Sequence, residues 1–222
     1  MKTDDVMLDG PRLLPASGQP PSSLVVLLHG LGTDGNDLFA LAPQLAKSLP
    51  GAAFVAPSAP DPSDTAPTGR QWFSFEDDGW KAAGEGVKRG AAILDAFLDA
   101  ELAHAGLDES CLALVGFSQG AMMAQHVGLR RAKACAGIAA FSGVFLRGKL
   151  QPGELNTETP VLLVHGDADD VVLVAAHYDA VSRLLTAGLS VQSHIRPGLG
   201  HGIDEPGLTY CQEFLAKNLA ET

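Results

Sequence analysis

Short runs of apolar residues recur along the chain, and helical spacing of apolar residues follows most of them. The apolar runs occupy residues 24–28, 52–56, 111–115, 137–141 and 161–165, and an alternating run occupies 191–196. Runs that are apolar throughout predict strands buried on both faces. Helices are expected at 87–105, 121–131, 174–187 and 206–219, and one more between 34 and 49. This alternation predicts an α/β fold, with a mainly parallel sheet between two helix layers.

Length and charge limit the organisation and the partners of the chain. With 222 residues, 46% of them hydrophobic, residues 1–222 are predicted to form one domain around one core. A formal net charge of −11 opposes phosphate backbones and anionic lipids, so no nucleic-acid partner is expected. No apolar run is long enough to span a membrane, and Asp4 and Asp5 stand where a secretory signal would be apolar. A cytoplasmic protein without stable membrane insertion is therefore expected.

The cysteines and the acidic segments do not have the spacing of a metal site. Cys111, Cys135 and Cys211 include no C-x-x-C pair and are odd in number, so neither a zinc site nor a disulfide framework is indicated. The acidic run at 167–170 lacks the glycine and the distal glutamate of a calcium-binding loop. The sequence predicts no metal site.

The segment Gly116-Phe117-Ser118-Gln119-Gly120 follows a predicted strand and precedes a predicted helix. It matches the G-x-S-x-G pattern, in which small residues on both sides of the serine allow a sharp strand-to-helix turn. Such a turn lifts the hydroxyl above the carboxyl end of the sheet, where open α/β sheets bind their ligands. The sequence therefore predicts Ser118 as a nucleophile, with a plain glycine-rich turn as the alternative.

A nucleophilic serine needs a base to accept its proton and a third group to orient that base. In folds with this turn the chain order is serine, acid, histidine. His126 and His177 fall in predicted helices and His194 in a predicted strand, whereas His201 lies in the glycine-rich loop after that strand. His201 is the predicted base.

The acid is expected directly after the buried strand at 161–165. Asp167, Asp169 and Asp170 follow one another there, and spacing alone does not choose among them. Asp204 is a fourth candidate, but its place just before Glu205-Pro206 is typical of a helix N-cap.

Attack of a serine on an acyl carbon makes the carbonyl oxygen negative, so N–H donors are needed beside it. The backbone N–H groups of Gln119 and of Leu31, in the turn after the first apolar run, are the predicted donors. The turn from Gly30 to Gly35 also matches the G-x-G-x-x-G pattern of dinucleotide-binding folds. We reject that alternative because Asp34 would place negative charge where the pyrophosphate binds, and the segment after the next strand lacks a ribose-binding acid.

Together these segments give the chain a family resemblance over nearly its whole length. They are Leu27-Leu28-His29-Gly30-Leu31-Gly32, Gly69-Arg70-Gln71-Trp72-Phe73, Gly116-Phe117-Ser118-Gln119-Gly120-Ala121, His165-Gly166-Asp167-Ala168-Asp169 and Gly198-Leu199-Gly200-His201. With them the chain resembles the phospholipase/carboxylesterase family, which includes the acyl-protein thioesterases and small bacterial carboxylesterases. Gly-Phe-Ser-Gln-Gly combined with Trp72-Phe73 is more specific than G-x-S-x-G alone.

The resemblance implies an α/β-hydrolase fold and a serine carboxylesterase that acts on small-molecule esters or thioesters without a cofactor. It selects Asp169 as the acid, and it assigns the oxyanion donors to Leu31 and Gln119. It also implies that Trp72, with the adjoining Phe73, borders the acyl pocket and binds substrate, and that the chain forms a homodimer. For Trp72, an aromatic residue that only covers the core is the alternative.

Two positions depart from the family pattern. Family members usually carry proline where this chain has Asp170, and the eukaryotic thioesterases typically carry histidine where it has Ser58. The long surface loop predicted at 57–69 and the segment Trp72-Phe73-Ser74 resemble the bacterial carboxylesterase branch more closely. A lysophospholipase and an acyl-protein thioesterase are the enzymatic alternatives, and a binding module on a hydrolase scaffold is the alternative without catalysis.

Overall fold

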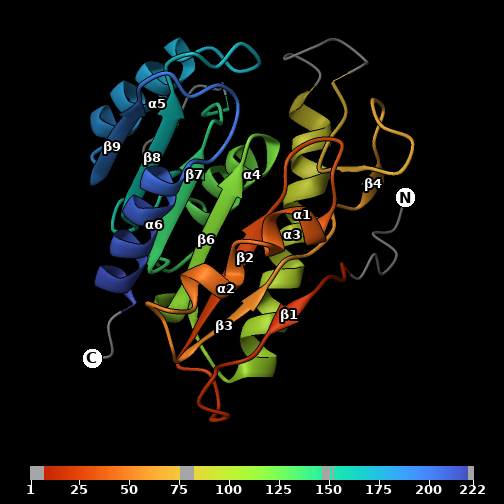
Figure 1. The fold of residues 1–222 in the computed structure, drawn as a ribbon, viewed down its shortest axis with the longest axis vertical. Coiled ribbons are helices and arrows are strands. Elements are labelled where there is room, and N and C mark those ends of the chain that lie inside the picture. Colours follow the sequence, from red (N-terminus) through yellow and green to blue (C-terminus); the bar gives the residue numbers. More distant parts are fainter. Residues whose placement is uncertain (1–7, 76–82, 147–150, 152, 220–222) are drawn as a thin grey trace.

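Seven strands form one sheet in the computed structural model of the chain, which describes residues 8–75, 83–146, 151 and 153–219 (Figure 1). Across the sheet they are β1 (Arg12–Leu13), β3 (Ala52–Val55), β2 (Ser23–Leu28), β6 (Leu112–Phe117), β7 (Gly137–Phe141), β8 (Val161–Gly166) and β9 (Val191–Arg196). All neighbours pair in parallel except β1, which runs antiparallel to β3. The mainly parallel sheet confirms the predicted fold class.

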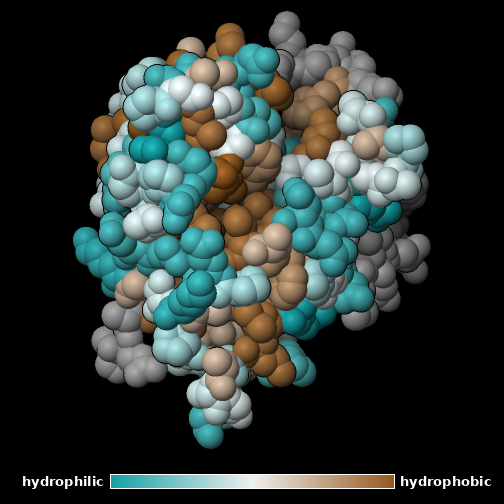
Figure 2. Space-filling view, viewed as in Figure 1, coloured by the Kyte–Doolittle hydropathy of each residue, from teal (hydrophilic) through white to brown (hydrophobic). Residues whose placement is uncertain are grey.

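Helices cover both faces of the sheet (Figure 1). The helices α3 (Ala83–Ala105), α4 (Gln119–Gly128) and α5 (Ala175–Thr186) pack on one face, and α1 (Gly35–Phe39), α2 (Ala42–Leu45) and α6 (Glu205–Asn218) on the other. An apolar band stays visible on the second face (Figure 2), and the partly buried residues that pack against this core include Phe39, Leu41, Phe117, Ile203 and Tyr210. No helix within the described ranges is long and apolar enough to cross a membrane.

Residues 34–49 form two short helices, α1 and α2, where one continuous helix was expected. The carboxylate of Asp34 caps α1 by accepting a hydrogen bond from the Asn36 N–H at 2.8 Å. Pro43 lies in the first turn of α2, and it has no N–H to donate to the preceding turn. The prediction of one helix was wrong because this proline begins a new helix.

Three two-residue strands, β1, β4 and β5, were also not expected. β1 pairs antiparallel with the predicted strand β3, and β4 (Asp61–Pro62) pairs antiparallel with β5 (Arg70–Gln71). Segments of two residues are too short to show a periodic pattern. The β6 strand runs to Phe117, further than predicted, and Cys111 belongs to a 3-10 helix before it.

The strand order reverses between β2 and β6. The chain leaves β2 outward to β3, whereas β6 lies on the other side of β2 and the later strands extend away from there. In open α/β sheets, ligands bind at such a reversal, beyond the carboxyl ends of the two strands. Because β2 and β6 pair from Leu24 with Leu112 to Leu28 with Gly116, residues 29–33 and 117–120 follow neighbouring strand ends at this reversal.

Two helix histidines lie away from full solvent exposure: His177 is buried and His126 is half-buried. His177 on α5 is 2% exposed, and its Nε2 lies 2.8 Å from Ser193 Oγ. Burial, together with the nearby His165 and His194, lowers the pKa of His177 to about 4. Burial also lowers the pKa of His126 on α4 to about 4. Both rings are therefore neutral in the folded protein at neutral pH.

These two histidines are expected to make the fold sensitive to acid. As the pH falls from 6.5 toward about 4, the unfolded chain takes up protons that the folded protein excludes, so the free energy of unfolding decreases. His177→Gln should reduce this slope by up to about 1.4 kcal/mol per pH unit, the value for one proton. Urea unfolding across this pH range measures the slope, and His126→Gln should reduce it similarly. Unchanged slopes in both variants would contradict the lowered pKa values.

Candidate active site

Ser118 lies at the end of β6, on the sharp turn into α4. Its backbone has φ 52° and ψ −116°, a region that residues other than glycine rarely adopt. The Ser118 N–H donates to the carbonyl of Phe141 on β7 at 2.9 Å, which holds the turn against the sheet. Ser118 is half-buried and so keeps access to solvent. A serine held in strained backbone at the carboxyl end of a central strand is the geometry of an activated nucleophile.

The glycines on either side of Ser118 are required by close packing. A Cβ atom on Gly116 would overlap the backbone of Gly120, and a Cβ atom on Gly120 would overlap the carbonyl of Leu28 on β2. A larger residue at either position would push α4 away from the sheet. The pattern that predicts Ser118 as a nucleophile therefore reflects the packing of the turn.

His201 and Asp169 are brought together as predicted, from the loops after β9 and β8. The Nδ1 atom of His201 lies 2.8 Å from Oδ2 of Asp169. The imidazole also packs on the ring of Phe117, with centroids 4.8 Å apart, so the imidazole stands beside the residue that precedes Ser118. In this conformation no hydrogen bond joins Ser118 Oγ to His201, both of which are described. Catalytic hydrogen bonds are often completed only when substrate binds.

The Asp169 carboxylate is buried and held from both sides. Its side chain is 0% exposed, and its Oδ1 accepts hydrogen bonds from the N–H groups of Val171 at 2.9 Å and Val172 at 2.8 Å. Burial raises the pKa of this carboxyl, but the hydrogen bonds from His201, Val172 and Val171 outweigh burial, and the pKa is lowered from its ordinary value. Asp169 is therefore ionised at neutral pH and keeps a proton of His201 on Nδ1.

Burial distinguishes the three carboxylates that spacing left open. Asp167 and Asp170 are exposed, whereas Asp169 is 3% exposed. Asp167 has a different role. Its Oδ1 accepts from the Gly198 N–H at 2.6 Å and so joins the loop after β8 to the loop after β9. The fourth candidate, Asp204, caps α6 through its side chain, as predicted.

The loop that carries Asp169 and the loop that carries His201 pack closely together at Gly166. A Cβ atom there would overlap the carbonyl oxygens of Leu199 and Gly200. The Ala168 N–H donates to the Leu199 carbonyl at 3.0 Å in the same place. This close approach explains the glycine three residues before Asp169 and holds the two loops together.

His165 is a further neighbour of Asp169 to which the sequence analysis gave no role. Its Nε2 lies 2.7 Å from the Val172 carbonyl oxygen and 3.3 Å from Asp169 Oδ2. Because both neighbours are acceptors, the proton of a neutral His165 belongs on Nε2. The ring thereby supports the loop whose N–H groups bind Asp169. In the sequence, only its place two residues before Asp167 indicates that His165 lies near the candidate acids.

The turn after β2 passes close to Ser118 at Gly30. A Cβ atom on Gly30 would lie 3.4 Å from the Cβ of Ser118. The Gly30 carbonyl lies 2.7 Å from His29 Nδ1 and accepts from Thr33 Oγ1 at 3.2 Å. This carbonyl and the Leu31 N–H belong to one planar peptide and point in opposite directions, so the two contacts orient the Leu31 N–H. Within the described residues that N–H has no acceptor.

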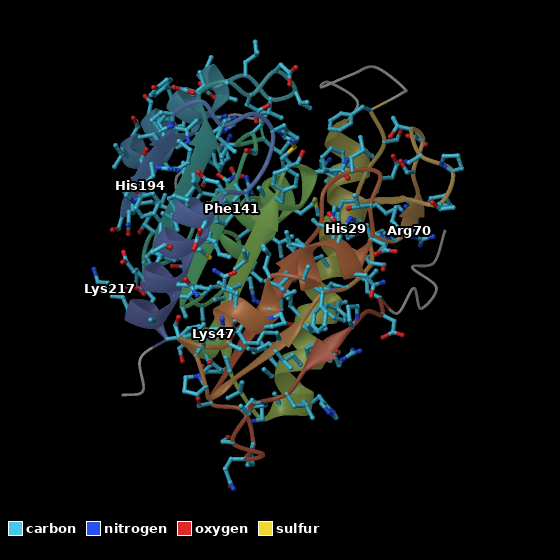
Figure 3. The ribbon with its side chains drawn as sticks, in the orientation of Figure 1. His29, Lys47, Arg70, Phe141, His194 and Lys217 are labelled. Atoms are coloured by element: carbon cyan, nitrogen blue, oxygen red, sulfur yellow. The ribbon has the colours of Figure 1, made fainter. Side chains whose placement is uncertain are left out.

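His29 supports this turn as a neutral ring of fixed tautomer. Its Nε2 accepts from the Ala59 N–H at 2.9 Å, so its proton is on Nδ1, where it donates to the Gly30 carbonyl. Burial lowers the pKa of His29 from its ordinary value. Arg70 lies nearby (Figure 3), and its Nε donates to the Ala59 carbonyl at 2.8 Å. The sequence analysis gave neither side chain a role.

Trp72 and Phe73, the predicted substrate-binding residues, are buried. Their side chains are 0% and 1% exposed. The indole Nε1 of Trp72 donates to the His29 carbonyl at 3.0 Å, and its backbone N–H donates to Gln119 Oε1 at 2.8 Å. In this conformation neither ring is open to a ligand, and their contact with substrate stays a prediction.

The alternative interpretations find little support at this site. Asp34 places a carboxylate at the start of α1, where a dinucleotide-binding fold would bind its pyrophosphate. The described residues contain no group of three His, Cys, Asp or Glu side chains that could hold a metal ion. The three cysteines are free, and burial raises the pKa of Cys135 and Cys211 to about 12.

The sequence of the chain is similar to those of known esterases and thioesterases. The sequence model of the phospholipase/carboxylesterase family matches residues 13–219. Esterase YpfH of Escherichia coli (strain K12) is 31% identical over 225 residues, which cover 97% of this chain and 88% of that protein. Acyl-protein thioesterase 1 of Neurospora crassa is 30% identical over 226 residues, which cover 94% of this chain and 91% of that protein.

A solved structure leads to the same conclusion. The crystal structure of esterase PE8 superimposes with a TM-score of 0.91 at 42% sequence identity, covering 96% of this chain and 100% of that chain. This agreement confirms the α/β-hydrolase fold, with a mostly parallel sheet flanked by helices. The chain belongs to the phospholipase/carboxylesterase family.

Proposed function

We propose that this protein is a serine carboxylesterase that hydrolyses carboxylic esters or thioesters through an acyl-enzyme on Ser118. The observation that carries the proposal is the 2.8 Å hydrogen bond between His201 Nδ1 and Asp169 Oδ2, beside a serine on a strained turn. Nucleophile, base and orienting acid are then present in the chain order of this fold. Family membership supports ester hydrolysis, and the geometry supports the serine mechanism.

In the first half of the reaction Ser118 Oγ attacks the acyl carbon. His201 Nε2 accepts the hydroxyl proton, and the carbonyl electron pair moves onto oxygen to form a tetrahedral intermediate. When the intermediate collapses, the bond to the alcohol or thiol breaks, and His201 returns the proton to that leaving group. Asp169 stays ionised throughout and stabilises the imidazolium through Nδ1.

In the second half a water molecule attacks the acyl-enzyme. His201 accepts a proton from this water, a second tetrahedral intermediate forms, and its collapse returns the proton to Ser118 Oγ and releases the carboxylic acid. Each proton moves through His201. The proposed reaction therefore needs neither a metal nor an organic cofactor.

The backbone N–H groups of Leu31 and Gln119 are the proposed donors to the oxyanion. They extend from the carboxyl ends of β2 and β6, which pair directly in the sheet. The Gln119 N–H is at the start of α4, so the positive end of the helix dipole adds to its effect. Donors fixed in this way are worth about 2.7–4 kcal/mol each in such enzymes.

A substrate series tests the proposed function and its substrate class. Initial hydrolysis rates for p-nitrophenyl esters from acetate to palmitate, with a matched thioester series, should show turnover by the wild-type protein. A maximum at short acyl chains supports a small-ester carboxylesterase. A maximum at long chains favours the lysophospholipase or acyl-protein thioesterase alternatives. The homodimer and the cytoplasmic location stay predictions of the sequence.

A fluorophosphonate probe separates an enzyme from a binding module on the same scaffold. The probe forms a covalent bond only with an activated serine, so the wild-type protein should be labelled at Ser118, as located by peptide mass spectrometry. Labelling at another serine, or absence of both labelling and turnover on all esters and thioesters, would support the binding module.

A further inference from the structure

The side chain of Gln119 connects the nucleophile turn to the segment of Trp72. It is 1% exposed. Its Oε1 accepts from the Trp72 N–H at 2.8 Å, and its Nε2 donates to the Phe73 carbonyl at 2.7 Å. A neighbouring donor and a neighbouring acceptor fix which end of the amide is oxygen, and they hold its plane in one orientation. The backbone N–H of Gln119 thus lies at the start of α4, while its side chain binds the Trp72 segment.

Trp72 extends this connection to the turn after β2. Its indole Nε1 donates to the His29 carbonyl at 3.0 Å, and its ring lies 5.6 Å from that of His29, centroid to centroid. The two N–H groups of this one residue therefore bind the turn after β2 and the turn after β6. Helix α3 closes behind it, because a Cβ atom on Gly90 would lie 2.5 Å from the Trp72 carbonyl oxygen.

We propose that Gln119 and Trp72 form a brace that sets the separation of the two oxyanion donors, and that both side chains are positioning residues for the reaction. This inference rests on the proposed function, which assigns those donors to Leu31 and Gln119. One end of the brace binds His29, two residues before the donor Leu31. The other end binds Gln119, which is itself the second donor. A change in either hydrogen bond would therefore move one donor relative to the other.

A brace of this kind acts on the transition state and leaves ground-state binding of substrate largely unchanged. Donors must lie where the charge develops, and the charge is present only in the tetrahedral species. Removal of one donor costs about 10²–10³ in kcat, so a misplaced donor should cost about 10–100-fold, with KM changed less than about threefold. A buried amide that only stabilises the fold would lower the melting temperature and leave kcat unchanged.

The test compares Gln119→Leu with a matched control in the same helix. Gln125 on α4 is also 1% exposed, but its Nε2 bonds only within the helix, to the Ala121 carbonyl at 3.1 Å, and its Oε1 has no partner among the described residues. Gln125→Leu removes an equally buried amide without touching the Trp72 segment. Trp72→Phe is the second test variant, because it removes the indole donor to His29, keeps an aromatic ring and keeps the backbone bond to Gln119.

Each variant is assayed for kcat and KM on one p-nitrophenyl ester, and for the Ki of a trifluoromethyl ketone. Ser118 Oγ adds to this ketone, its proton passes to His201, and the ketone oxygen becomes an oxyanion that cannot expel a leaving group. We expect Gln119→Leu and Trp72→Phe to lower kcat about 10–100-fold and to raise Ki by a similar factor. Gln125→Leu should change both values less than about threefold.

Several outcomes would overturn the brace. Unchanged kcat and Ki in folded Gln119→Leu would leave its amide a structural group only, while the proposed function would stand. A raised KM with unchanged kcat would make the Trp72 segment a ground-state binding surface. If Gln119→Leu does not fold, the same readouts on Trp72→Phe decide. Absence of turnover in the wild-type protein would overturn both the proposed function and the brace.

Discussion

The Ser118→Ala variant should lose ester hydrolysis almost completely, with kcat lower by about 10⁶-fold. Without Oγ no acyl-enzyme forms, and the remaining donors and base can only assist direct attack by water. The fold should be unaffected, since the serine hydroxyl makes no hydrogen bond among the described residues. Two measurements check this result: the burst of p-nitrophenolate in the first turnover, and labelling by a fluorophosphonate.

Ser142 provides a matched control for this variant. It follows β7, the strand beside β6, and its φ of 49° resembles the 52° of Ser118. It is 1% exposed, and its Oγ has no hydrogen-bond partner within the described residues. Ser142→Ala therefore introduces the same side chain in a similar backbone conformation and should change kcat less than about threefold. Near-normal turnover by Ser118→Ala would refute Ser118 as the nucleophile.

The sequence singles out Ser118 as the candidate nucleophile because the signal is local. A buried strand, a turn with two small residues and a helix follow one another without a gap, so the chain itself places Ser118 at the edge of the sheet. His201 could be chosen because its rivals lie in predicted helices or strands. The choice of Asp169 depends instead on packing, because two backbone N–H groups hold this carboxylate in the interior. Spacing in the sequence does not show which of the three nearby aspartates these N–H groups bind.

The supporting residues are the part that the sequence alone does not predict. Nothing in the local pattern says that the Gln119 amide reaches Trp72 across 47 positions of the chain, or that His29 accepts from Ala59 across 30. These contacts depend on the parallel pairing of β2 with β6 and on the path of the chain between β3 and β5. The family resemblance assigns Trp72 to the substrate pocket, which stays a prediction, and the structure adds that its two N–H groups are engaged by backbone and amide oxygens.

The Asp169→Asn variant should show the second large effect, a fall in kcat of about 10⁴-fold. The carboxylate accepts the Nδ1–H of His201 and so leaves Nε2 free to take the serine proton. An asparagine can present its NH₂ group to Nδ1, which moves the ring proton to Nε2 and removes the base. The Val171 and Val172 N–H groups can still bind the amide oxygen, so the loop should keep its shape.

Asp170→Asn is the control for that variant, because it makes the same chemical change in the same loop on an exposed side chain. It should change kcat less than about threefold. Fluorophosphonate labelling of Asp169→Asn should be slowed in proportion to kcat, since both reactions need the base. If Asp169→Asn were nearly as active as the wild-type protein while Asp170→Asn lost activity, the acid would be Asp170, and the 2.8 Å contact with His201 would have no part in catalysis.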